Sequence, residues 1–163
     1  MGEHQQMILK GIIDTDFVNY RKICMILEFP NCSFKCDKEC GEKVCQNSSL
    51  ADAPTHHISM DKIIESYLNN PLTEAIVFQG LEPFDSIIDL IGFIRKFRKI
   101  SDDDIVIYTG YNKNELKKPI GILSKYKNII IKFGRYIPHQ KPHYDKILGV
   151  NLASDNQYAE RIN

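Results

Sequence analysis

Four short apolar runs constrain the fold of this chain more than any other feature. They cover residues 22–29, 74–78, 104–108 and 128–133, and apolar side chains dominate each of them. Runs of this length are typical of strands that are buried on both faces, as in a parallel sheet. Turn residues and helix-like patterns follow them, so the sequence predicts an α/β fold with a mostly parallel sheet.

Three segments with helical spacing complete this pattern. Ser59 can cap a helix that ends near 69–71, a second helix is expected over about 84–99, and a third over about 114–125, where Pro119 should break or restart it. The chain is too short for eight strand–helix units, so we expect a partial, open β/α barrel. The expected apolar faces of the first two helices contain Ile63, Ile64, Tyr67, Leu68, Ile87, Ile88, Ile91, Ile94 and Phe97.

Length and composition favour one soluble domain over residues 1–163. Lys and Arg together number 21, as do Asp and Glu, so no net charge attracts nucleic acid or an anionic membrane. No apolar run approaches the ~20 residues of a membrane span, and the N-terminus does not resemble a signal peptide. We therefore expect a cytoplasmic protein. The basic run 95–99 is most simply a solvated helix end.

A cysteine-rich loop follows the first apolar run and shows no periodicity over about 30–55. Cys32, Cys36 and Cys40 stand at four-residue steps, and Cys45 comes close behind. In a reducing compartment clustered thiols indicate metal or redox chemistry, and thiolate is the ligand that iron–sulfur clusters and zinc select. Cys24 lies inside the run 22–29, and we interpret it as a small core residue.

Zinc is the alternative to a cluster in this loop. Cys45 could complete a four-sulfur tetrahedron with the other three thiolates, although this spacing does not favour a structural zinc site. The histidines stand at no spacing that pairs them with the thiols. We interpret His56, His57, His139 and His143 as solvated loop residues.

Three further segments follow the later apolar runs, namely 80–82, 109–110 and 134–135. Because the carboxyl ends of parallel strands meet at one edge of a sheet, we expect these segments and the cysteine loop to share one rim. Each segment could also be an ordinary turn, and Asn156 could either bind a ligand or cap a last helix.

With these residues in view, the chain resembles the radical S-adenosylmethionine (SAM) family, and within it the small activases of the anaerobic ribonucleoside-triphosphate reductase. The resemblance covers nearly the whole chain. It rests on the cysteine loop and on the segments 80–83, 108–111, 134–136 and 154–157.

The resemblance implies a [4Fe-4S] cluster held by Cys32, Cys36 and Cys40, with SAM on the open iron. An electron from a low-potential donor would cleave SAM to methionine and a 5'-deoxyadenosyl radical. That radical would take a hydrogen atom from a glycine of the partner, an anaerobic ribonucleotide reductase, whose loop enters through the open side of the barrel. The residues expected to bind SAM are Gly80, Glu82, Thr109, Gly110 and Asn156.

The sequence departs from the family pattern at two places. The cysteine spacing is three and then three residues, with Glu39 where the family has an aromatic, so Cys45 remains an alternative to Cys40. Leu81 replaces the second glycine of the family's Gly-Gly-Glu-Pro motif. Two other functions stay open: a radical SAM enzyme acting on another peptide or small molecule, and a non-catalytic zinc-stabilised binding module.

Overall fold

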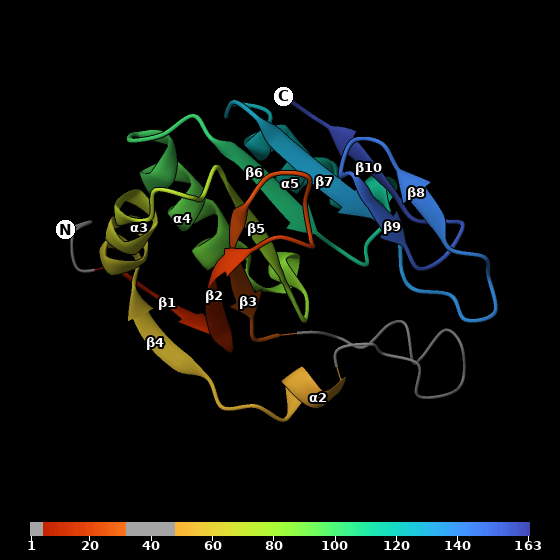
Figure 1. The fold of residues 1–163 in the computed structure, drawn as a ribbon, viewed down its shortest axis with the longest axis horizontal. Helices are drawn as coiled ribbons and strands as arrows, with labels where there is room; N and C mark the ends of the chain where they lie inside the picture. The colour runs from red at the N-terminus through yellow and green to blue at the C-terminus, as the bar shows by residue number, and fades with distance from the viewer. Residues whose placement is uncertain (1–4, 32–47) are drawn as a thin grey trace.

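The computed structural model describes residues 5–31 and 48–163 and contains a six-stranded mixed sheet at its centre (Figure 1). Four neighbouring strands are parallel, and they correspond to the four apolar runs. Two antiparallel strands flank them, so the order is β10-β7-β6-β5-β3-β2. The strands are β2 (Gly11–Asp16), β3 (Cys24–Phe29), β5 (Ala75–Gly80), β6 (Asp104–Tyr108), β7 (Ile129–Phe133) and β10 (Tyr158–Arg161).

The predicted α/β class and mostly parallel sheet are therefore confirmed. Within the described ranges the sheet does not close into a barrel, because β2 and β10 remain its two edges. The open-barrel architecture stays a prediction.

Helices cover one face of this sheet. They are α3 (Met60–Asn69), α4 (Ile87–Arg98) and α5 (Lys117–Leu123), and they share a core with alternate strand residues such as Leu27, Phe78 and Ile107. Ser59 caps α3 as predicted, since its Oγ accepts a hydrogen bond from the Lys62 amide at 3.4 Å. Leu68 and Ile88, expected on apolar faces, are instead 51% and 80% exposed.

The opposite face of the sheet packs against the C-terminal segment. A hairpin of β8 (His143–Asp145) and β9 (Val150–Leu152) lies beside β10, and Leu148 and Leu152 join a second core with Ile26 and Val106 (Figure 1). Cys24 is buried in this core, which confirms the interpretation of it as a core residue. Burial raises the pKa of its thiol to about 12.

Several elements differ from the sequence-based expectation. Two strands outside the four apolar runs, β1 (Gln6–Leu9) and β2, precede β3. The loop 30–55 contains the short helix α2 (Ser48–Ala51). Strand β1 pairs with β4 (His56–Ser59), a partner far along the chain that local patterns cannot reveal.

The structure also bears on the proline and histidine positions. Pro119 lies in the first turn of α5, where a helix amide has no intrahelical acceptor, so the expected helix over 114–125 restarts just before it, at Lys117. A 3-10 turn, η3 (Lys113–Leu116), precedes that helix. His56 and His57 are exposed but belong to a strand, and half-buried His143 lies 2.7 Å from the carbonyl oxygen of Gln157.

Candidate functional site

The carboxyl end of β3, which leads into the cysteine loop, is hydrogen-bonded to the segment that follows β5. The Leu81 amide donates to the Phe29 carbonyl at 3.2 Å, and the Glu82 amide donates to the Asn31 carbonyl at 2.7 Å. The Asn31 side chain also donates to Ser86 Oγ at 3.0 Å. The entrance to the cysteine loop and the segment 80–83 therefore share one edge of the sheet.

Gly80 is required at this edge by the backbone itself. Its φ is +96°, and a Cβ atom there would lie 2.7 Å from the Phe29 backbone nitrogen. Only glycine adopts this conformation easily and allows the two parallel strands to approach this closely. The glycine thus has a structural reason to be present, and its expected contact with SAM stays a prediction.

Glu82 lies at the centre of the rim and is only 5% exposed. Its carboxylate accepts hydrogen bonds from the Thr109 hydroxyl at 2.8 and 2.9 Å, from the Gly110 amide at 2.8 Å and from the Phe84 amide at 3.0 Å. The structure thereby brings three of the predicted site residues into direct contact. An ionised carboxylate has about four acceptor positions, and the described residues fill three of them, which leaves one position for a donor from outside this part of the chain.

The environment of Glu82 opposes its ionisation. Burial raises the pKa of its carboxyl group from 4.5 to about 7, although the hydrogen bonds from Gly110, Phe84 and Thr109 act in the opposite direction. Within the described part of the chain, no ion pair joins this carboxylate to a cation. Glu82 is therefore a buried acid that titrates near neutral pH.

Arg135 extends the rim to the end of β7. Its guanidinium is paired with Glu115 at 2.9 Å and lies 5.7 Å from the centre of the Tyr111 ring. The Tyr111 hydroxyl donates to Asp85 at 2.5 Å. A Cβ on Gly110 would lie 3.5 Å from Arg135 Cγ, so the loops after β5, β6 and β7 form one connected layer.

Asn156 lies at the same rim, in a turn rather than at the cap of a helix. Its amide group donates to the Arg135 carbonyl at 2.7 Å and accepts from the Ser154 hydroxyl at 2.7 Å. Gln157 donates to the Gly134 carbonyl at 3.2 Å. These bonds hold the loop after β7 in place, and a contact of Asn156 with SAM stays a prediction.

Lys132 is a rim residue that the sequence analysis did not single out. Its ammonium donates to the Gly134 carbonyl at 3.1 Å and lies 5.8 Å from the centre of the Tyr108 ring, and the residue is 7% exposed. A lysine inside an otherwise apolar strand was the available signal, since such a charge is rarely buried without a reason. It adds a buried positive charge beneath the loops.

The expected cluster ligands Cys32, Cys36 and Cys40, and the alternative Cys45, lie outside the described residues. Between 5 and 31 and between 48 and 163, no group of three His, Cys, Asp or Glu side chains could hold a metal ion. The cysteine loop is therefore the part of the chain whose donor chemistry suits an iron–sulfur cluster.

Comparison with known proteins agrees with this chemistry. A family model described as a 4Fe-4S single cluster domain matches residues 21–157, a span that includes the cysteine loop and every rim residue named above. Neither the curated proteins nor the solved structures gave a match. Among the described residues, no helix combines the length and the apolar character needed to cross a membrane.

Proposed function

Because this chain belongs to the family of 4Fe-4S single cluster domains, we propose that it is a radical SAM enzyme whose cluster is held by Cys32, Cys36 and Cys40. Thiolates are the ligands of such clusters, and three of them leave one iron free for a chelating substrate. When bound and reduced by a low-potential donor, the cluster supplies the electron that cleaves SAM to methionine and a 5'-deoxyadenosyl radical.

The observation that carries this proposal is the hydrogen bond from the Glu82 amide to the Asn31 carbonyl, at 2.7 Å. Asn31 directly precedes Cys32 in the sequence, so the chain enters the cysteine loop beside the Glu82, Thr109 and Gly110 cluster. A ligand bound at the cysteine loop could then reach these side chains.

The rim residues suit the amino acid end of SAM, which carries an ammonium and a carboxylate. Glu82 has one acceptor position left and no cation paired with it in the described structure, so the ammonium can donate to it. Lys132 in β7 and Arg135, two residues after the end of β7, supply positive charge near the rim for the carboxylate. These residues bind and orient SAM rather than react with it.

We further propose that the substrate is a glycine-bearing loop of an anaerobic ribonucleotide reductase. The chain has few strand–helix units, so its proposed partial barrel leaves one side open to a loop of a large protein. The radical would remove one hydrogen atom from the glycine Cα, which yields 5'-deoxyadenosine and a glycyl radical on the partner.

The experiment that tests the reaction combines the anaerobically reconstituted protein, SAM, a reductant and the reductase from the same source. A glycine-centred doublet in the electron paramagnetic resonance spectrum is expected, and it should require the reductant. Reductive SAM cleavage without a protein radical would exclude the partner but retain the chemistry. Absence of both an iron–sulfur spectrum and SAM cleavage would overturn the whole proposal.

The ligand set is tested by replacing each thiol of the loop with alanine. Iron and sulfide should be lost after anaerobic reconstitution of Cys32→Ala, Cys36→Ala and Cys40→Ala, while Cys45→Ala should load fully. A loaded Cys40→Ala together with an empty Cys45→Ala would instead assign the third ligand to Cys45.

Glu82→Gln tests the SAM contact, with Asp104→Asn as its matched control at the other end of the sheet. Loss of a charge-assisted hydrogen bond costs about 1.5–3 kcal/mol, or about ten- to a hundredfold in affinity. SAM affinity should therefore fall by that factor in Glu82→Gln and stay unchanged in Asp104→Asn, with the cluster intact in both. Equal affinities would remove Glu82 from the SAM site.

A further inference from the structure

A concave basic surface, here called the basic groove, lies at the end of the molecule opposite the rim. Its volume is ≈ 360 Å³. Three residues come from the end of α4 and three from the turn between α5 and β7. They are Arg95, Arg98, Lys99, Lys125, Tyr126 and Lys127, and the acidic Asp102 also lines the groove.

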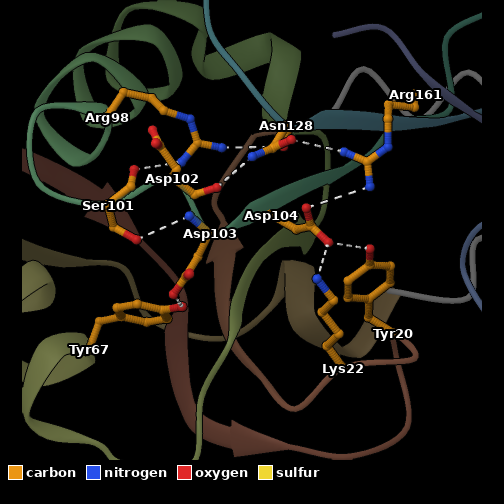
Figure 2. A network of polar contacts seen from close by, with 10 residues as sticks. All are labelled: Tyr20, Lys22, Tyr67, Arg98, Ser101, Asp102, Asp103, Asp104, Asn128 and Arg161. Carbon is orange, nitrogen blue, oxygen red and sulfur yellow. Dashed lines mark hydrogen bonds and ion pairs between the residues drawn. The ribbon is translucent and has the colours of Figure 1, made fainter.

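Arg98 fixes the two halves of the groove against each other. Its guanidinium donates from Nη2 to the Asn128 carbonyl at 3.2 Å and from Nη1 to the Ser101 carbonyl at 2.9 Å (Figure 2). Its Nε also donates to the Lys127 carbonyl at 2.8 Å. The turn that carries Lys125 and Lys127 is therefore held beside α4. The groove exists before any ligand arrives, which lowers the entropic cost of binding.

The protein compensates the charges of the groove only in part: Asp102, Asp103 and Asp104 act on Arg98, which is half-buried in the groove wall. Lys127 and Asp102 are 3.9 Å apart and are 74% and 65% exposed, so this ion pair is weak. In the part of the chain that the structure describes, no ion pair joins Arg95, Lys99 or Lys125 to a carboxylate. A helix end accounts for one basic run, but here two runs converge on one concavity, and their mutual repulsion favours an anion between them.

We propose that the basic groove binds a small molecule that carries a polyphosphate chain. The cations match a chain of several negative charges, and a cavity of ≈ 360 Å³ lies in the range of small-molecule pockets rather than of a protein interface. Half-buried Tyr126 forms an apolar wall beside the cations. The groove lies near the start of β6, whereas Thr109 and the rim follow its end, so this ligand would not compete with SAM.

The test measures binding of inorganic triphosphate and of ATP to the cluster-loaded full chain by anaerobic calorimetry. A double variant, Lys99→Gln with Lys125→Gln, should lower both affinities at least about tenfold, because it removes two charged contacts. The matched control, Lys117→Gln with Lys118→Gln, changes the same charge at exposed positions outside the groove and should change affinity less than about twofold.

Other results would overturn the proposal. One is a wild-type protein that does not bind triphosphate, whether or not it binds ATP. Another is a control variant that loses as much affinity as the groove variant. Capture of a single-stranded oligonucleotide without any binding of triphosphate would assign the surface to nucleic acid instead. The visible absorption of the cluster, recorded in each titration, verifies that triphosphate has not removed iron.

Discussion

Two carboxylates at opposite ends of the parallel strands are equally buried, yet the pKa of one is raised and the pKa of the other is lowered. Glu82 at the rim and Asp104 at the start of β6 are each 5% exposed. Glu82 receives hydrogen bonds from neutral donors, namely a hydroxyl and two backbone amides, and burial raises its pKa to about 7.

Asp104 has cations around it instead. Lys22 lies 2.9 Å away, Arg161 lies 3.5 Å away, and the Tyr20 hydroxyl donates to the carboxylate at 2.7 Å (Figure 2). Burial opposes its ionisation, but the hydrogen bonds from Lys22 and Tyr20 and the charges of Lys22 and Arg161 outweigh burial, so the pKa of Asp104 is lowered.

The comparison indicates different roles for the two ends of the sheet. Asp104 has its cationic partners within the chain, and these contacts link β10 and the segment before β3 to β6. Among the described residues no cation is paired with Glu82, an arrangement that fits the proposed site for a ligand with an ammonium group. The next four predictions break or sharpen this contrast, in order of decreasing effect.

The largest effect is expected from Gly80→Ala. A residue with a Cβ is strained at φ +96°, and the added atom would lie 2.7 Å from the backbone nitrogen of Phe29, which cannot move without shifting β3. We expect the free energy of unfolding to fall by about 3 kcal/mol or more, measured by anaerobic denaturant titration.

Gly121→Ala is the control for that substitution. Gly121 lies in α5, and nothing lies within 4 Å of an added Cβ, so alanine should stabilise by about 0.5–1 kcal/mol. Similar stability changes in the two variants would show that the rim backbone is not closely constrained. Because Gly80 is structural, Glu82 is the cleaner probe of SAM binding.

Asp104→Ala should destabilise the protein by about 2 kcal/mol. It removes the acceptor of the buried Tyr20 hydroxyl and leaves Lys22 and Arg161 without their shared counter-ion. SAM affinity should not change, because the contacts of Asp104 lie at the far end of β6. A loss of SAM affinity larger than the loss of stability would contradict the separation of the two ends.

The two carboxylates should also give opposite pH dependences. The pKa of Glu82 is about 7 in the folded protein and 4.5 as its ordinary value, so the folded state binds more protons between these values. Its contribution to stability therefore falls as the pH rises from about 4.5 to 7, by at most about 1.4 kcal/mol per pH unit.

Denaturant titrations across this range measure the effect, with Glu82→Gln as the reference that cannot titrate. The variant should gain stability relative to the wild type as the pH rises. Asp104 behaves in the opposite way: its lowered pKa stabilises the fold above its unfolded value and that stabilisation is lost on acidification. Parallel curves for wild type and Glu82→Gln would show that Glu82 is ionised throughout.

The sequence was sufficient for the parallel core of the fold and for the location of the rim. The runs 104–108 and 128–133 closely match β6 and β7, because strands buried on both faces leave a continuous apolar signal. The meeting of Glu82, Thr109 and Gly110 followed from topology alone. Pairings between distant segments, such as β1 with β4, leave no local signal and were missed.

The electrostatic character of the site was also beyond the sequence. Glu82 and Asp104 are both acids beside a strand, and their pKa values differ because burial prevails at Glu82, whereas Lys22, Tyr20 and Arg161 outweigh it at Asp104. The basic groove likewise arises because α4 and the turn 125–127 are brought together, whereas the run 95–99 by itself predicts a solvated helix end.

The smallest effect is expected at Thr109, which separates the contribution of one hydrogen bond from that of burial. Its hydroxyl donates to Glu82 at 2.8 and 2.9 Å and accepts from the Tyr111 amide at 3.0 Å, and the residue is 2% exposed. Thr109→Val keeps the shape but removes both bonds, so the free energy of unfolding should fall by about 1 kcal/mol.

The hydrogen bond from the Thr109 hydroxyl lowers the pKa of Glu82, so its removal should move the Glu82-dependent stability change to higher pH. Thr109→Ser, which retains the hydroxyl, should leave that pH unchanged; an equal shift in both variants would assign the effect to packing, and the Thr109 hydroxyl would then play no part in tuning the rim carboxylate.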